Sequence, residues 1–193
     1  MGRPKQFDPD TAVERAMGVF WRKGYAATTP QDLVDEIGIG KGSLYNTFGS
    51  KHALFERALA RYRDEQAATL VALLEDPADP PKERLRSALR MLVMLDIADP
   101  DRRGCLAVNT ATELATSDDG AAETVRRMFA RSESAYRVAI EDAQRAGEID
   151  AAKDPRALAG LLLATAIGLR VMAKVADGPD ELLRIADAAV DAL

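Results

Sequence analysis

The chain has 193 residues, of which 26 are Lys or Arg and 31 are Asp or Glu, so its formal net charge is -5. This acidic balance excludes a polycation that coats nucleic acid nonspecifically. Apolar residues make up 47% of the chain, enough to bury a core, while a single Cys and a single His exclude an internal disulfide and argue against a metal site.

The sequence also disfavours a membrane protein or a secreted one. No apolar run reaches the roughly 18 residues of a membrane span, and residues 1–5 lead into no apolar signal core. We therefore expect a soluble, cytoplasmic protein with no metal, no cofactor and no membrane partner.

The first predicted helix begins at Asp8-Pro9, because Asp caps helices and Pro fits the first helical turn. Gly24 suits the left-handed position that ends a helix. Between them, apolar side chains recur at the spacing that lines one helix face: Val13, Ala16, Met17, Phe20 and Trp21.

The next two predicted helices are short and closely spaced. Thr29 caps the second, Asp32 stands in its favourable first turn, and Gly38 ends it. In the third, Leu44 and Phe48 are four residues apart and should face inward, which turns a cationic and hydrogen-bonding set outward: Lys41, Ser43, Tyr45 and Asn46. Helix, Gly-containing turn and helix is the helix-turn-helix plan, whose second helix enters the major groove of DNA.

The remaining sequence predicts six more helices and no strand. Gly and Pro stand between most of the expected elements, and no segment alternates with period two over the length of a strand. The expected helices run from 51 toward 75, from 80–81 to a break at 99–104, over about 105–116, between 120 and 147, from 154–155 onward, and after 178–179. The fold class is therefore all-α, with about nine helices.

Charge is distributed unevenly between the two parts of the chain. Residues 1–63 carry ten Lys or Arg against seven acids, and residues 64–193 carry 16 against 24. No acid occurs from residue 37 to residue 55. This pattern favours a nucleic-acid reader joined to an acidic body over the alternative, the start of an ordinary helical bundle.

Residues 2–59 resemble the DNA-binding head of TetR/AcrR-type bacterial transcriptional regulators. The matching pieces are GRPKQFD and AMGVFWRKGYAATTPQDLVDEIGIGKGSLYNTFGSKHALFERAL, above all GIGKGSLYNTFGSKHALF. Gly40 departs from the family pattern, in which many relatives have Ser or another small polar residue. The resemblance implies a three-helix DNA-binding domain at 1–50 and a ligand-binding and dimerisation domain at 51–193.

The resemblance also implies which residues meet double-stranded operator DNA. Lys41, Ser43 and Tyr45 would contact phosphates or adjacent bases, and Asn46 would read a base edge. Gly42 would allow close approach to the groove. The remaining implied contacts are the phosphate clamps Thr29 and Lys51 and the minor-groove arm residues Arg3 and Lys5.

In this family the last two helices of each subunit form a four-helix homodimer interface, and the fifth to eighth helices enclose a cavity for a small-molecule inducer. The residues expected to line that cavity are Met91, Leu92, Met94, Leu95, Cys105, Asn109, Thr110, Glu113, Met128, Phe129, Tyr136, Leu163, Ile167 and Met172. The alternative for each is an ordinary place in the core.

Cys105 follows two arginines in Arg102-Arg103-Gly104-Cys105-Leu106. At the start of a helix and near two guanidinium groups its thiolate form is favoured, which makes a reactive thiol. RGCL-xVNTAxEL also resembles a subset of these regulators, some of which sense electrophiles or oxidants through a Cys. The alternative is an inert buried Cys.

The function expected from these features is a homodimeric repressor that leaves a near-palindromic operator when a small molecule or an electrophile binds the body. One alternative is a helical ligand- or protein-binding dimer without DNA-binding activity. An enzyme is disfavoured, because G-x-S-x-G, H-E-x-x-H and P-loop patterns are absent and no catalytic residues are expected.

Overall fold

A computed structural model describes residues 7–76 and 78–193. Within these ranges the chain forms nine α-helices and no β-strand, which confirms the expected all-α class. The helices are α1 (Pro9–Lys23), α2 (Pro30–Ile37), α3 (Lys41–Phe48), α4 (Lys51–Leu74), α5 (Pro81–Ala98), α6 (Leu106–Leu114), α7 (Asp119–Arg145), α8 (Pro155–Met172) and α9 (Asp180–Asp191).

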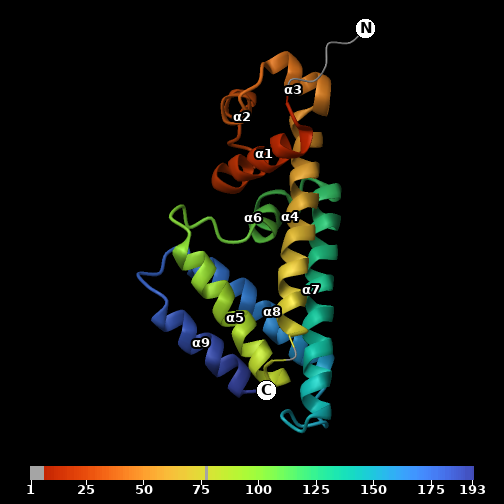
Figure 1. The fold of residues 1–193 in the computed structure, drawn as a ribbon, viewed down its shortest axis with the longest axis vertical. Helices are drawn as coiled ribbons and strands as arrows, with labels where there is room; N and C mark the ends of the chain where they lie inside the picture. Colours follow the sequence, from red (N-terminus) through yellow and green to blue (C-terminus); the bar gives the residue numbers. More distant parts are fainter. Residues whose placement is uncertain (1–6, 77) are drawn as a thin grey trace.

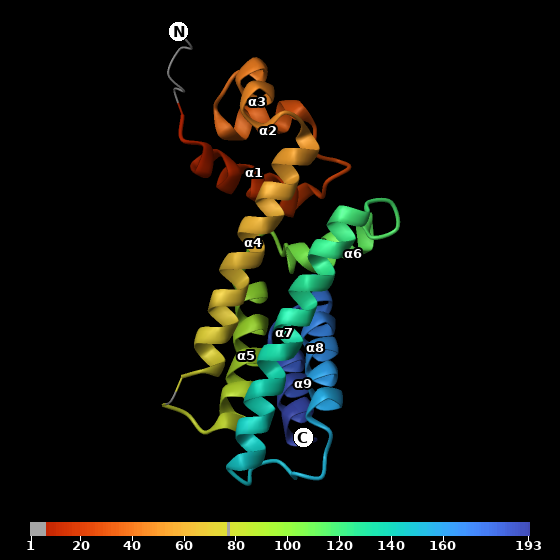
Figure 2. The same cartoon turned by 90° about the vertical axis from the view of Figure 1, so that its right-hand side faces the viewer.

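The helices are arranged as a small head on a longer body (Figure 1). Helices α1, α2 and α3 form the head at one end, and α4 runs from the head into the body, where α7 packs against it. The body is completed by α5, α8 and α9, and the short α6 lies between the two parts (Figure 2). The C-terminus lies at the end of the body farthest from the head.

Local capping interactions set the helix starts in the head. Asp8 accepts hydrogen bonds from N–H groups of the first turn of α1, and Thr29 and Asp32 form a reciprocal capping box at α2. Ser50 accepts a hydrogen bond from the backbone N–H of Ala53, at 3.0 Å, and so begins α4. Each of these starts lies where the sequence predicted it, because a cap is recognised from residues within one turn.

Helix α6 is shorter than the expected span of about 105–116. Cys105 is its N-cap, and the helix covers only Leu106 to Leu114. It ends there because the backbone N–H groups of Ser117 and Asp118 both donate to the carbonyl oxygen of Leu114, at 3.0 and 2.9 Å, which turns the chain toward α7.

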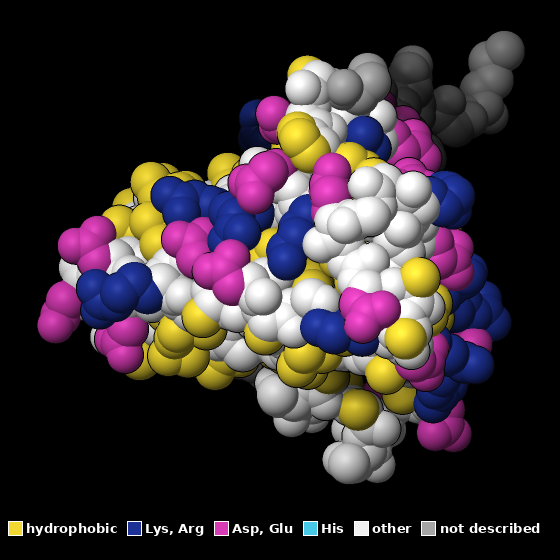
Figure 3. Space-filling model, turned by 90° about the horizontal axis from the view of Figure 1, so that it is seen from below, with side chains coloured by type: hydrophobic (Ala, Val, Ile, Leu, Met, Phe, Trp, Pro, Cys, Tyr) yellow, Lys and Arg dark blue, Asp and Glu magenta, His cyan; other side chains and the backbone are white. Residues whose placement is uncertain are grey.

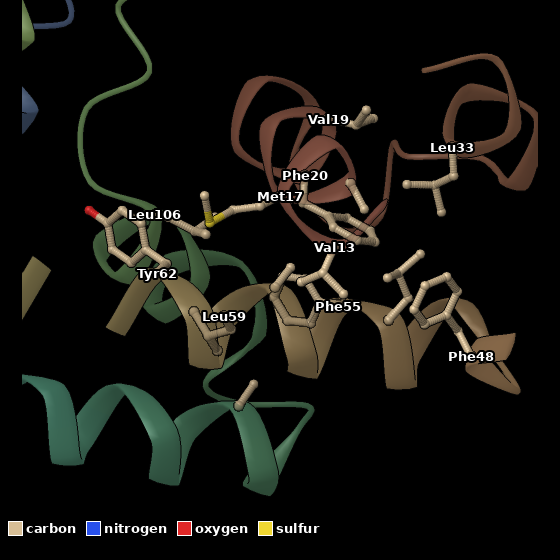
Figure 4. Close-up of a cluster of buried hydrophobic side chains, with 14 of the residues drawn as sticks. Val13, Met17, Val19, Phe20, Leu33, Phe48, Phe55, Leu59, Tyr62 and Leu106 are labelled. Atoms are coloured by element: carbon tan, nitrogen blue, oxygen red, sulfur yellow. The ribbon is translucent and has the colours of Figure 1, made fainter. Parts of the chain in front are cut away.

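The core of the head continues into the body through α4 and α6. Figure 4 shows Phe55 of α4 directed toward α1, which presents Val13 among its buried side chains, and Leu59 belongs to the same cluster. Tyr62 and Leu106 extend the same cluster toward α6. A second buried cluster is formed by α5, α7, α8, α9 and the end of α4, so α4 belongs to both cores.

Helix α8 is the one helix of the described residues that is long and apolar enough to cross a membrane. Its only charged residues are Arg156 and Arg170. The same length and composition occur in core helices, and α8 packs against α5, α7 and α9. The hydroxyl of Thr165 donates to the carbonyl oxygen of Leu161, at 2.9 Å, so this polar side chain is satisfied within the helix.

Candidate DNA-binding head and ligand cavity

The third helix presents a polar face with no acidic residue. Leu44 and Phe48 are 2% and 4% exposed and hold α3 against the head core, as expected from their spacing. The opposite face carries Lys41, Gly42, Ser43 and Asn46, which are exposed, and Tyr45, which is half-buried. A side chain at Gly42 would meet nothing within 4 Å, so packing inside the chain does not require glycine at this position.

Lys51 and Thr29 are already engaged within the head. The Lys51 ammonium group donates to the carbonyl oxygens of Tyr25 and Thr28, both at 2.9 Å, and lies 4.2 Å from the centre of the Tyr25 ring. The Thr29 hydroxyl is bonded to Asp32. An ammonium group has three N–H donors, so one remains for the phosphate contact expected of Lys51. Arg3 and Lys5 lie outside the described residues.

An ion pair joins the last residue of α1 to the first turn of α2. The Lys23 ammonium nitrogen lies 2.5 Å from a carboxylate oxygen of Asp32. Its hydrogen bond, together with those from the backbone and hydroxyl of Thr29, lowers the pKa of Asp32 to about 2. The charged form of Asp32 is therefore the one that fits this corner of the head.

A cavity of about 350 Å³ lies within the body, between α4, α5, α6, α7 and α8. Its walls are mostly apolar. Nine of the fourteen residues expected at the cavity line it: Met91, Leu92, Leu95, Cys105, Met128, Phe129, Tyr136, Leu163 and Ile167. It is also lined by residues that sequence reasoning did not select: Tyr62, Gln66, Thr69, Leu70, Ala107, Val108, Ser132, Ala166 and Arg170.

Three of the five other expected residues lie on α6, which turns their side chains away from the cavity. Asn109 donates to the carbonyl oxygen of Arg103 and accepts from the Lys174 ammonium group. The hydroxyl of Thr110 is buried and has no partner among the described residues. Met94 and Met172 are absent from the cavity wall as well and are 49% and 39% exposed.

Glu113, the third of these residues, ties the body to the head. Its two carboxylate oxygens accept hydrogen bonds from the backbone N–H groups of Tyr25 and Ala26, at 2.9 and 2.6 Å. Gly24 lies so close that an added Cβ would stand 2.9 Å from Glu113 Oε2. Glu113 therefore links α6 to the loop that precedes α2.

Arg170 is the one charged side chain among the described residues that line the cavity. Its guanidinium group makes two 2.9 Å hydrogen bonds to the buried carboxylate of Asp96 and a 3.1 Å bond to the carbonyl oxygen of Gly104. Its Nη1 atom makes only long contacts, 3.5 Å each, to the hydroxyl of Tyr62 and to Gln66 Oε1. The two residues of this pair are 74 positions apart, so no local sequence pattern predicts it. The one indication in the sequence is an Arg within the apolar stretch of α8.

The surroundings of Cys105 differ from the expected pair of guanidinium groups. Arg103 is bonded to Asp99 and lies over the Trp21 ring, and Arg102 donates to the carbonyl oxygen of Ala173. The partner of Cys105 is instead the hydroxyl of Tyr62, which donates to its Sγ atom at 3.3 Å. Cys105 is 9% exposed and forms part of the cavity wall.

The two tyrosines in the cavity wall are neutral. Burial raises the pKa of Tyr62 well above its usual value and also raises the pKa of Tyr136. Both hydroxyl groups therefore keep their protons and can donate hydrogen bonds.

Comparison with known proteins places both parts of the chain in one family. Residues 12–58 match the family model described as bacterial regulatory proteins, tetR family. Residues 81–189 match the tetracyclin repressor-like C-terminal domain. An uncharacterised HTH-type transcriptional regulator of Bacillus subtilis, YezE, is 33% identical over 100% of both chains.

Two further relatives are described as regulators of transcription. The HTH-type transcriptional repressor ComR of Escherichia coli is 31% identical over 96% of this chain and 88% of its own. A solved structure of the TetR family transcriptional regulator CifR, a cysteine mutant complexed with 26-base-pair operator DNA, has a TM-score of 0.88, with 31% identity over 99% of each chain. This chain therefore belongs to the TetR family of bacterial transcriptional regulators.

Proposed function

We propose that this protein is a homodimeric transcriptional repressor of the cytoplasm that binds a near-palindromic operator and leaves it when a small molecule fills the cavity. The observation that carries the proposal is the acid-free outer face of α3, held on the same continuous core that reaches the wall of the cavity. One molecule thus contains a DNA-reading surface, a ligand cavity and a packed connection between them.

The DNA contacts in this proposal come mainly from α3. Lys41 and Ser43 bind phosphates, Tyr45 adds a hydroxyl at the edge of the groove, and Asn46 reads a base edge. Lys41, Ser43 and Asn46 are exposed on this helix, which supports this assignment. Thr29 and Lys51 act at the rim, where the hydrogen bonds of Lys51 to the head also fix its position.

Dimerisation is assigned to α8 and α9. The outer face of α8 exposes large apolar side chains, among them Leu161 and Val171, each 48% exposed. Gly160 and Gly168 lie on the same helix with open space where a Cβ would stand, which allows a partner helix to approach closely. Viewed from the end of the body, hydrophobic side chains gather along its edges between charged groups (Figure 3).

The proposed coupling between ligand and DNA runs through α6 and α4. Tyr62 of α4 lines the cavity, and its ring lies 4.9 Å from that of Trp21 in the head, measured between ring centres. Glu113 of α6 holds the loop before α2. A ligand that binds the non-DNA-binding arrangement more tightly shifts the population toward it through these contacts.

An electrophile is a second class of inducer, favoured by the position of Cys105 in the cavity wall. Replacement of Cys105 by Ser tests this version. A Cys105→Ser protein that is released from DNA by the same compounds at the same concentrations rules out thiol chemistry and leaves reversible binding as the trigger.

The test of the proposed function is selection of DNA sequences by the full-length protein, followed by affinity measurements at several salt concentrations. We expect a near-palindromic site, bound by a dimer with strong salt dependence. Failure to enrich any sequence, with a dimer present in solution, would support the alternative of a ligand- or protein-binding dimer without DNA-binding activity.

A further inference from the structure

We infer that the cavity binds a compact, uncharged molecule that carries one hydrogen-bond acceptor, such as a ketone, in preference to an anion. This inference rests on the proposed function only for the effect of the ligand on DNA binding. The binding of the ligand depends only on residues of the body. It follows from the size of the cavity, from one unpartnered hydroxyl group and from the balance of buried charge.

The size of the cavity limits the ligand. A volume of about 350 Å³ corresponds to roughly twelve water molecules at about 30 Å³ each, so a molecule of about ten non-hydrogen atoms fits. Leu92, Phe129 and Leu163 belong to its predominantly apolar wall. The greater part of the ligand is therefore hydrocarbon.

Tyr136 supplies the polar group that the ligand would satisfy. Its side chain is 1% exposed and lines the cavity, and no hydrogen bond joins its hydroxyl to another described residue. Burying a hydroxyl without a partner is unfavourable, whereas a ligand acceptor beside it removes that cost. Because the hydroxyl keeps its proton, it can donate a hydrogen bond, and an acceptor atom of the ligand would match it.

The charge balance argues against an anionic ligand. Arg170 is the only charged residue of the described cavity wall, and its charge is already matched by two hydrogen bonds to Asp96, a residue that is 4% exposed. A carboxylate in the cavity would add a second negative charge beside one guanidinium group, without solvent to stabilise it. A neutral oxygen can still accept from Arg170 Nη1, whose two present contacts are 3.5 Å long.

Three probes of about the same size separate these possibilities: acetophenone, benzoate and isopropylbenzene. Calorimetric titration of the full-length protein should show acetophenone binding at least tenfold more tightly than benzoate. In Tyr136→Phe, acetophenone should lose about tenfold in affinity, the value of one hydrogen bond, while isopropylbenzene loses nothing. Ser134→Ala, which removes an exposed hydroxyl from the same helix outside the cavity wall, is the matched control and should leave both affinities unchanged.

Tighter binding of benzoate than of acetophenone would overturn the inference in favour of an anion site. Equal losses for acetophenone and isopropylbenzene in Tyr136→Phe, or no binding by any of the three probes, would overturn it as well. Affinity for the selected DNA, measured on the same samples, keeps the two proposals apart: intact DNA binding with no acetophenone binding removes only the ligand class, and acetophenone binding without any selected DNA removes only the repressor.

Discussion

Trp21 of the head and Arg170 of the cavity wall donate hydrogen bonds to the same atom, the carbonyl oxygen of Gly104, each at 3.1 Å. Gly104 has a φ of 66°, and an added Cβ would stand 2.7 Å from a side-chain carbon of Lys174. The turn before α6 is therefore closely packed, and a ligand that moves Arg170 also disturbs the hydrogen bonding of Trp21.

Trp21→Phe should weaken the response to ligand more than it weakens DNA binding. Phe keeps an aromatic ring against Tyr62 but removes the indole N–H that reaches Gly104. We expect a loss of about 1 kcal/mol in the free energy of unfolding. We also expect that the inducer lowers the DNA affinity of the variant by a smaller factor than it lowers that of the unchanged protein. Urea unfolding and DNA titration measure the two effects; an unchanged ratio would show that this hydrogen bond plays no part in coupling.

Glu113→Gln should loosen the contact between α6 and the head. The amide of Gln has only one acceptor oxygen, so one of the two bonds to the N–H groups of Tyr25 and Ala26 is lost. We expect a cost of about 1–2 kcal/mol in unfolding free energy, together with altered DNA affinity. Glu123→Gln is the control, since Glu123 pairs only with exposed arginines of its own helix, and it should change neither quantity. Identical behaviour of the two variants would contradict the role given to Glu113.

Asp96→Ala should destabilise the protein by about 3–5 kcal/mol, because it leaves the largely buried guanidinium of Arg170 without its counter-charge. Asp187→Ala, which breaks partly exposed pairs with Arg90 and Arg86, should cost less than about 1 kcal/mol. Chemical unfolding of the two variants gives the comparison. Similar losses in both would mean that solvent reaches Arg170 freely.

Lys41→Ala should weaken binding to all DNA sequences alike and reduce the slope of log affinity against log salt by about one. Tyr45→Ala should weaken operator binding with the fold intact, because the exposed face of α3 does not form the head core. Lys82→Ala, at the start of α5 in the body, is the control for removal of a positive charge. An equal change of slope in Lys41→Ala and Lys82→Ala would remove α3 from the phosphate contacts.

Acid should loosen the junction of α1 and α2 through Asp32. The pKa of Asp32 is depressed to about 2, so its contribution to stability is fully present above the unfolded value of about 4 and is lost as the pH falls toward 2. Asp32→Asn should lack this part of the pH dependence. A carboxyl titration followed by NMR checks the assignment, and a midpoint near 4 for Asp32 would refute it.

Sequence reasoning succeeded where the determining contacts are local. The caps Asp8, Thr29 and Ser50 act within three residues of themselves, and Leu44 and Phe48 share one helix face. These features require knowledge of only one helical turn.

It succeeded less well where a side chain meets a distant partner. Glu113 was expected in the ligand cavity and instead binds a loop 87 residues away. The hydrogen bonds of Lys51 to two backbone carbonyl groups were not anticipated either, and they leave one N–H donor for the predicted phosphate contact. Arg170 was not selected at all, because its pairing with Asp96 depends on how α5 and α8 pack. The direction of a polar side chain between helices is set by tertiary contacts, which composition and periodicity do not contain.

The membership of α4 in both cores has a mechanical consequence. With 24 residues the helix is about 36 Å long at 1.5 Å per residue, so a tilt of about 5° at the cavity end displaces the other end by roughly 3 Å. That distance is close to the rise of one base pair, about 3.4 Å. In a two-fold assembly the α4 helices of both subunits move together. A shift too small to disturb either core is then enough to move the two heads out of register with successive turns of the double helix.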